Sequence, residues 1–198
     1  CGREPCHPER LAGNRQPPAH LVRHPDGAEP EFDLQKTITD MLAAGIRVCW
    51  TDPVAEGFSL LPWCSGPLYE ILQARQIPLL LEFPQTTADT LDVVLQDFPG
   101  LRLILLSVPR LGRNRLIYPL LQRHPNLMIC LSYTYSVHQG VEDLCRTFGH
   151  ERWVFGMGYP TAETGASLTG LTYAAIPDEA KEAIAHGNIE RLLAEVRV

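Results

Sequence analysis

The chain has 198 residues, of which 45% are hydrophobic and 20% are charged. These values are typical of a soluble globular protein with a sizeable core, and we expect residues 1–198 to form a single domain. Lys and Arg number 17 against 23 Asp and Glu, a net charge of −6. This acidic balance argues against nucleic acid or an anionic membrane as a partner. The apolar runs are too short to span a bilayer.

The six cysteines form no metal or disulfide signature, because no Cys-x-x-Cys pair is present. Cys49 and Cys130 fall in apolar runs, where a thiol behaves as a small hydrophobic group. We therefore expect reduced thiols and a cytoplasmic protein. The first residue is Cys1 rather than Met. We expect the natural chain to continue upstream of it.

Helix-like and strand-like stretches alternate along the chain after a Pro-rich start that ends near residue 31. Apolar spacing predicts helices at residues 32–45, 65–76, 86–100, 113–126 and 138–150. Short apolar runs predict strands at residues 46–50, 77–83, 101–108, 127–133 and 152–156. Ser65 is the expected cap of the second helix. The tail, residues 177–196, predicts two short helices broken at Gly187.

Five alternations with continuous apolar strands predict a parallel sheet that is buried on both faces. A doubly wound sheet and a (β/α)8 barrel both fit this pattern. Gly156-Met157-Gly158 is followed by Tyr-Pro-Thr, which is not the dinucleotide fingerprint. The barrel is therefore favoured. Because a full barrel needs about 250 residues, we expect an incomplete one that lacks its first strand.

The runs RHPNLMICLSY, ERWVFGMGYP and IPDEAKEAIAHGNIERLL resemble the C-terminal half of the amidohydrolase-related family. The runs GIRVCWTDP, GPLYEILQARQIPLLLE and FPGLRLILLS resemble the third, fourth and fifth barrel strands of that family, and HPERLAG resembles the second. The resemblance implies that the chain covers strands two to eight of a barrel. The first strand, with its His-x-His pair, would lie upstream of Cys1.

The resemblance also implies which positions would hold a divalent metal. Family members that bind a metal carry an Asp where this chain has Gly158, and a His at the positions of Glu82 and Ser107. Glycine has no ligand atom, and serine is a poor ligand for transition metals. We therefore expect no cofactor and no usual metal site from this chain. A weak divalent site made by an upstream His-x-His and Glu82 is left open.

Chemistry in a barrel lies at the carboxyl ends of the strands. There we expect Glu82 or His138 as general acid or base. A small carboxylate would be held by Arg110, Arg113 and Tyr133, with Gly158 in the floor of the pocket. Each of these residues could instead have a structural role. Glu82 would form an ion pair with an arginine, the arginines would lie in a solvated loop, and His138 would mark the start of a helix. His124 precedes a proline and indicates a turn.

Two functions of different classes follow from these residues. The first is a hydrolase or lyase that acts on a small carboxylated compound without the usual metal site. The alternative is a catalytically inactive barrel that binds a metabolite or a partner protein, since a fold does not fix a function. A homo-oligomeric state is left open.

Overall fold

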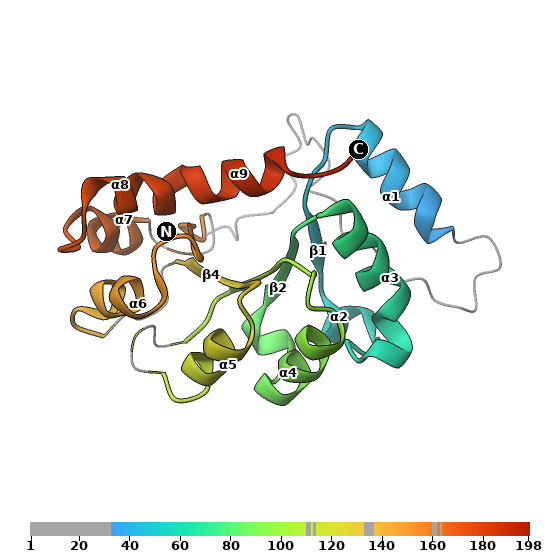
Figure 1. Ribbon diagram of the computed structural model, residues 1–198, viewed down its shortest axis with the longest axis horizontal. Helices are drawn as coiled ribbons and strands as arrows, with labels where there is room; N and C mark the ends of the chain where they lie inside the picture. Colours follow the sequence, from blue (N-terminus) through green and yellow to red (C-terminus); the bar gives the residue numbers. More distant parts are fainter. Residues whose placement is uncertain (1–32, 110–111, 113, 133–136, 160–161, 163) are drawn as a thin grey trace, which may run out of the picture.

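The computed structural model describes residues 33–109, 112, 114–132, 137–159, 162 and 164–198. At its centre is a parallel five-stranded sheet in the order β1-β2-β3-β4-β5 (Figure 1). The strands are β1 Cys49–Thr51, β2 Leu79–Glu82, β3 Leu103–Leu106, β4 Leu127–Leu131 and β5 Trp153–Phe155. Neighbours in the sheet are also neighbours in sequence, as they are in a barrel wall. All five expected strands are confirmed, and each is shorter than its apolar run.

The two faces of the sheet are both apolar, because each strand alternates its side chains between them. Leu79, Leu103 and Leu127 are paired in register and lie on the face that the helices cover, which we call the outer face. Leu80 and Ile104 lie on the opposite face, which we call the inner face. A sheet buried on both faces requires continuous apolar strands, which the sequence supplies.

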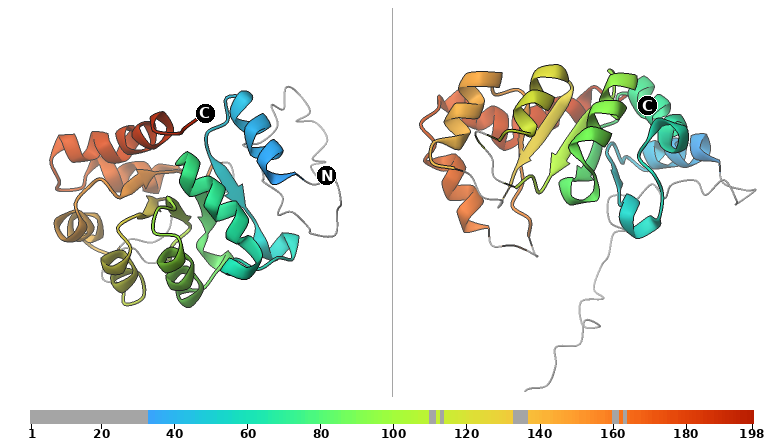
Figure 2. Two further views of the ribbon diagram at one scale, coloured as in Figure 1. Left: turned by 45° about the vertical axis from the view of Figure 1, so that its right-hand side comes forward. Right: turned by 90° about the horizontal axis from the view of Figure 1, so that it is seen from below.

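Four helices follow one another along the outer face (Figure 2). They are α3 Pro62–Arg75, α4 Ala88–Asp97, α5 Ile117–Arg123 and α6 Gly140–Phe148. The expected cap of α3 is wrong: the helix begins at Pro62, and Ser65 lies inside it. The Ser65 hydroxyl instead donates to the carbonyl of Ser59 at 2.6 Å. Pro62 fixes the first turn without losing a hydrogen bond, which explains the earlier start.

Further short elements connect these layers. Helix α1 Leu34–Ala43 begins at Asp33, whose side chain accepts from the backbone N–H of Lys36 at 3.0 Å. Helix α2 Pro53–Glu56 and the 3-10 turn η2 Phe83–Gln85 follow β1 and β2. Helix α7 Gly165–Thr172 follows β5. Neither α2 nor α7 is predicted by the apolar pattern.

The tail is helical throughout, as α8 Asp178–Glu182, the π turn η3 Ala183–Gly187 and α9 Asn188–Ala194. The expected break at Gly187 is therefore wrong. Gly187 has helical angles, φ −58° and ψ −40°. The side-chain amide of Asn188 donates to the carbonyls of His150 and Trp153, each at 2.8 Å. This attachment to β5 holds the turn helical, so tertiary contacts override the low helix propensity of glycine.

Helix α9 crosses the amino ends of the strands, along the top of Figure 1. Arg102, just before β3, forms an ion pair with Glu195 at 2.5 Å. Leu192 and Ile189 of α9 pack on the inner face of the sheet. The helix therefore covers one end of the incomplete barrel. The other end, where the strands finish, is the one at which barrel enzymes place their chemistry, and we call it the mouth.

One arginine joins the amino ends of β4 and β5. Arg152 donates to the carbonyl of Leu121 at 2.7 Å, to that of His124 at 2.6 Å and to that of Leu127 at 2.9 Å. These carbonyls end α5 and begin β4, so the planar guanidinium satisfies several main-chain acceptors at once.

The expected second strand lies outside the described residues. No strand follows Phe155 among the described residues of 156–198. Within the part of the chain that the structure describes, no helix combines the length and apolar character that a membrane crossing needs.

Candidate active site at the mouth

Among the described strand residues of the inner face, Glu82 alone is charged. Apart from Glu82, the described strand residues on this face are apolar: Trp50, Leu80, Ile104, Leu106, Met128, Cys130 and Val154. Glu82 is the last residue of β2 and is half-buried. The sheet therefore presents a carboxylate at the mouth and an apolar wall below it. A ligand at the mouth would meet both.

Cys130 lies on the same face, with Leu106 of β3 between it and Glu82. Its thiol is free, and the residue is 7% exposed. Burial, and then the negative charge of Glu82, raise the pKa of the Cys130 thiol to about 12. At neutral pH the thiol therefore stays protonated and acts as a wall group rather than a nucleophile.

The turn after β5 is shaped by glycines. A Cβ atom added at Gly156 would come within 2.6 Å of the Cys130 sulfur. Gly158 has φ +69°, in the left-handed region that favours glycine. A side chain at Gly156 would collide with the inner wall, and one at Gly158 would strain the backbone. Local geometry therefore explains why this turn has glycine, without a side chain, at positions 156 and 158.

Backbone strain and unpaired polar side-chain atoms both occur at or near the mouth. Ser107, directly after β3, has φ +51°, which is rare for a residue other than glycine. Among the described residues, five have buried polar side-chain atoms without a hydrogen-bond partner. Three of these, Thr51, Glu56 and Ser132, lie at or just after strand ends at the mouth. Unsatisfied groups of this kind are typical of sites that bind a ligand or ordered water.

The structure can be compared with the predicted site residues. Glu82 and Gly158 lie at the mouth, Glu82 as the last residue of β2 and Gly158 after β5. His138 is exposed and precedes α6, and among the described residues it forms no hydrogen bond or ion pair with Glu82. The remaining predicted residues fall outside the described residues: Arg110, Arg113 and Tyr133. Their shared pocket stays a prediction.

Cys130 was not among the predicted site residues. In the run LMICLSY, period-two alternation places Met128, Cys130 and Ser132 on one face. The same rule places Glu82 on the face of Leu80 in IPLLLEF. Reading both alternations together would have placed the thiol and the carboxylate on one wall.

The described residues at the mouth do not complete a metal site. Nowhere in the described part of the chain do three or more His, Cys, Asp or Glu side chains gather closely enough to hold a metal ion. Glu82 supplies a single carboxylate, whereas divalent metals need several protein ligands or waters. We therefore derive no chemical step that uses a metal.

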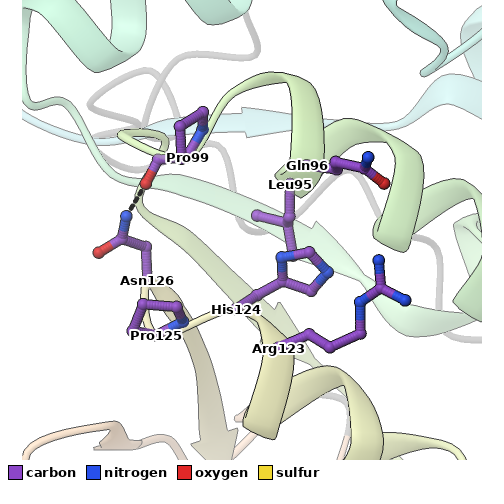
Figure 3. A pocket seen from close by; sticks show the side chains of 7 residues that line it. All are labelled: Leu95, Gln96, Pro99, Arg123, His124, Pro125 and Asn126. Carbon is purple, nitrogen blue, oxygen red and sulfur yellow. Dashed lines mark hydrogen bonds between the residues drawn. The ribbon is translucent and has the colours of Figure 1, made fainter.

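A cavity of about 350 Å³ lies at the amino ends of the strands, opposite the mouth (Figure 3). Its lining comes from the ends of α4 and α5 and includes His124 and Asn126, whose amide donates to the carbonyl of Pro99. His124 Nε2 lies 2.7 Å from Asp92 Oδ1, and its side chain is 8% exposed. His124 does end α5, as its turn prediction implies. The pair with Asp92 joins α5 to α4 and has a structural role.

Sequence comparison decides the family. The sequence profile described as amidohydrolase matches residues 15–194. The chain belongs to the amidohydrolase family. No curated protein matches the sequence.

Solved structures confirm the fold of this amidohydrolase-family chain. An uncharacterised TIM-barrel protein from Bordetella bronchiseptica is 26% identical, with a TM-score of 0.64 over 81% of this chain and 62% of that one. A dihydroxybenzoic acid decarboxylase from Polaromonas, with bound manganese and 2-nitroresorcinol, is 14% identical, with a TM-score of 0.62 over 81% of this chain and 64% of that one.

A third similar structure is 4-oxalomesaconate hydratase from Rhodopseudomonas palustris. It is 16% identical, with a TM-score of 0.53 over 84% of this chain and 62% of that one. The chain thus spans less than two thirds of these barrels. The expected incomplete (β/α)8 barrel is confirmed.

Proposed function

We propose that this amidohydrolase-family chain forms the substrate-binding wall of a lyase that acts on a small carboxylated compound, with Glu82 as its acid–base group. The observation that carries the proposal is the placement of Glu82. It is the one charged strand residue on the described inner face, and it lies at the mouth. Acid–base groups of barrel enzymes come from strand ends of this kind.

The solved structures favour a lyase over a hydrolase. The dihydroxybenzoic acid decarboxylase and the oxalomesaconate hydratase share the fold, and 2,6-dihydroxybenzoate decarboxylase does as well. Decarboxylation breaks a carbon–carbon bond, releases CO₂ and places a proton on the carbon that carried the carboxylate. Protonated Glu82 would deliver that proton and would then recover one from water. The apolar wall of Leu80, Leu106 and Cys130 would pack against the uncharged part of the substrate.

Binding of the carboxylate itself falls to groups other than Glu82, since two carboxylates repel each other. Arg110, Arg113 and Tyr133 keep this predicted role, and His138 keeps its predicted role as a second acid–base group. Gly158 leaves room at the floor where a carboxylate side chain would add negative charge. A divalent ion held by Glu82 and an upstream His-x-His would be a further anion partner, and elemental analysis of the purified chain tests for it.

The test is a decarboxylation assay on 2,6-dihydroxybenzoate and 5-carboxyvanillate, with and without added Mn²⁺. We expect CO₂ release from the wild-type chain and a loss of about 100-fold or more in the Glu82→Gln variant. The matched control is Glu70→Gln, because Glu70 is exposed on α3. Equal rates in Glu82→Gln and wild type would refute the role of Glu82. Binding of these compounds without turnover would favour the inactive binding module instead.

A further inference from the structure

A groove lies at the rim of the mouth, between the segments that follow β1 and β2. It has a volume of about 400 Å³ and is lined by Pro53, Val54, residues 57–61, residues 85–87 and Thr90. We call it the rim groove. Its volume falls in the range of pockets that bind small molecules. Because Gln85 lines it and follows Glu82 by three positions, the groove lies near the candidate active site.

The rim groove is uncharged. None of the described residues that line it carries a charge, although the chain has a net charge of −6. Its apolar lining includes Val54, which is 70% exposed, together with Phe58 and Leu61. A charged ligand group would lose its water there without gaining a partner of opposite charge.

The hydroxyl groups in the rim groove are already used. Ser59 Oγ accepts from the backbone N–H of Leu61 at 3.2 Å. Thr87 Oγ1 accepts from the backbone N–H of Thr90 at 3.1 Å and shares a hydrogen bond with the Thr90 hydroxyl at 2.9 Å. Thr86 Oγ1 donates to the carbonyl of Thr87 at 3.4 Å. Each hydroxyl is therefore held in a local turn, which uses part of its hydrogen-bonding capacity.

Gln85 supplies the exception. Its side-chain oxygen accepts from the backbone N–H of Val54 at 3.0 Å, which fixes the orientation of the amide. Its side-chain NH₂ has no partner among the described residues. An amide donor therefore stands in the uncharged rim groove.

We propose that the rim groove binds an uncharged aromatic ring that carries one hydrogen-bond acceptor, with the acceptor on the amide of Gln85. The assignment of this ring to the substrate rests on the proposed function. The ability of the groove to bind a ring does not depend on it. An aromatic ring fits the apolar lining of Val54, Phe58 and Leu61. The amide donor of Gln85 then fixes its orientation, as in other small-molecule sites.

The test is an NMR titration of the ¹⁵N-labelled chain with phenol and, separately, with toluene. We expect phenol to shift the amide signals of 53–61 and 85–90. Val54→Asp should weaken phenol binding about tenfold or more, since it places a charge in the apolar lining. The matched control, Val93→Asp, changes an exposed valine of α4 outside the groove and should leave phenol binding unchanged. Gln85→Met should weaken binding of phenol more than that of toluene.

Shifts confined to Glu82 and Cys130, shifts spread over the surface, or no shifts would overturn the proposal. Equal phenol affinity in wild type and Val54→Asp would do the same. These outcomes leave the decarboxylation assay untouched, because that assay depends on Glu82. Conversely, loss of the proposed reaction would not move the phenol shifts, so the two failures can be told apart.

Discussion

The sulfur of Cys130 lies against Gly156 across the two neighbouring strands β4 and β5, so closely that a Cβ atom at Gly156 would come within 2.6 Å of it. The thiol fills the space that a side chain after β5 would occupy.

The contact predicts a coupling between the two positions. Gly156→Ala should lower the free energy of unfolding by about 1–3 kcal/mol through overpacking. In a Cys130→Ala background the same change should cost clearly less, because the sulfur is gone. Urea denaturation of the four proteins of this double-mutant cycle measures the coupling. Additive effects would show that the two groups do not touch.

At Gly187, in contrast to Gly156, replacement by alanine should stabilise the protein. Its backbone is helical, and an added Cβ would lie 3.7 Å from the carbonyl oxygen of Glu182, an ordinary contact. Gly187→Ala should therefore raise the free energy of unfolding by about 0.5–1 kcal/mol. Thermal denaturation checks the sign. A lower melting temperature would favour the helix break that the sequence predicts.

Arg152 should be sensitive to a conservative change. Lysine keeps the charge but has no planar fork, so it cannot satisfy the carbonyls of Leu121, His124 and Leu127 together. We expect Arg152→Lys to lower the free energy of unfolding by about 2–3 kcal/mol in urea denaturation. Arg146→Lys is the matched control, because the Arg146 side chain is 72% exposed. Equal effects of the two changes would argue against the described network.

The fold was largely predictable, and the reasons are local. Each of the five strands is a continuous apolar run that ends at turn residues, and this pattern follows from burial on both faces. The predictions that were wrong failed because of tertiary contacts. Pro62 starts α3 before the expected cap Ser65, and Asn188 holds the tail helical through Gly187 by hydrogen bonds to β5. Sequence periodicity contains no information on such contacts.

The candidate site was predictable in part. Position at the end of an apolar strand was enough to place Glu82 at the mouth. The position of Cys130 on the same wall as Glu82 depends on which residues of β2 and β4 share a face and on the register of β3 between them. The rim groove joins two segments about 30 residues apart and has no sequence motif.

The Cys130 thiol predicts a pH dependence of stability. Its pKa is raised from an ordinary value of 9.0 to about 12 in the folded protein. As pH rises above 9.0, the unfolded chain loses the thiol proton while the folded chain keeps it. The stability linked to this group is therefore complete below that pH and is lost as pH rises toward about 12.

Comparison with Cys130→Ala isolates this contribution, because Tyr69 and Cys145 titrate in the same alkaline range. The stability advantage of wild type over Cys130→Ala should shrink by on the order of 1 kcal/mol as pH is raised through that range. Urea denaturation at several alkaline pH values measures it. A constant difference would mean that burial does not raise the pKa of the Cys130 thiol.

Glu82 should exchange a proton with a ligand bound at the mouth. Infrared difference spectra, recorded on adding 2,6-dihydroxybenzoate to wild type and to Glu82→Gln, test it most directly. We expect a change between carboxylate and protonated carboxyl bands that is present in wild type and absent from Glu82→Gln. A spectrum without such a change in wild type, or the same change in both proteins, would contradict it.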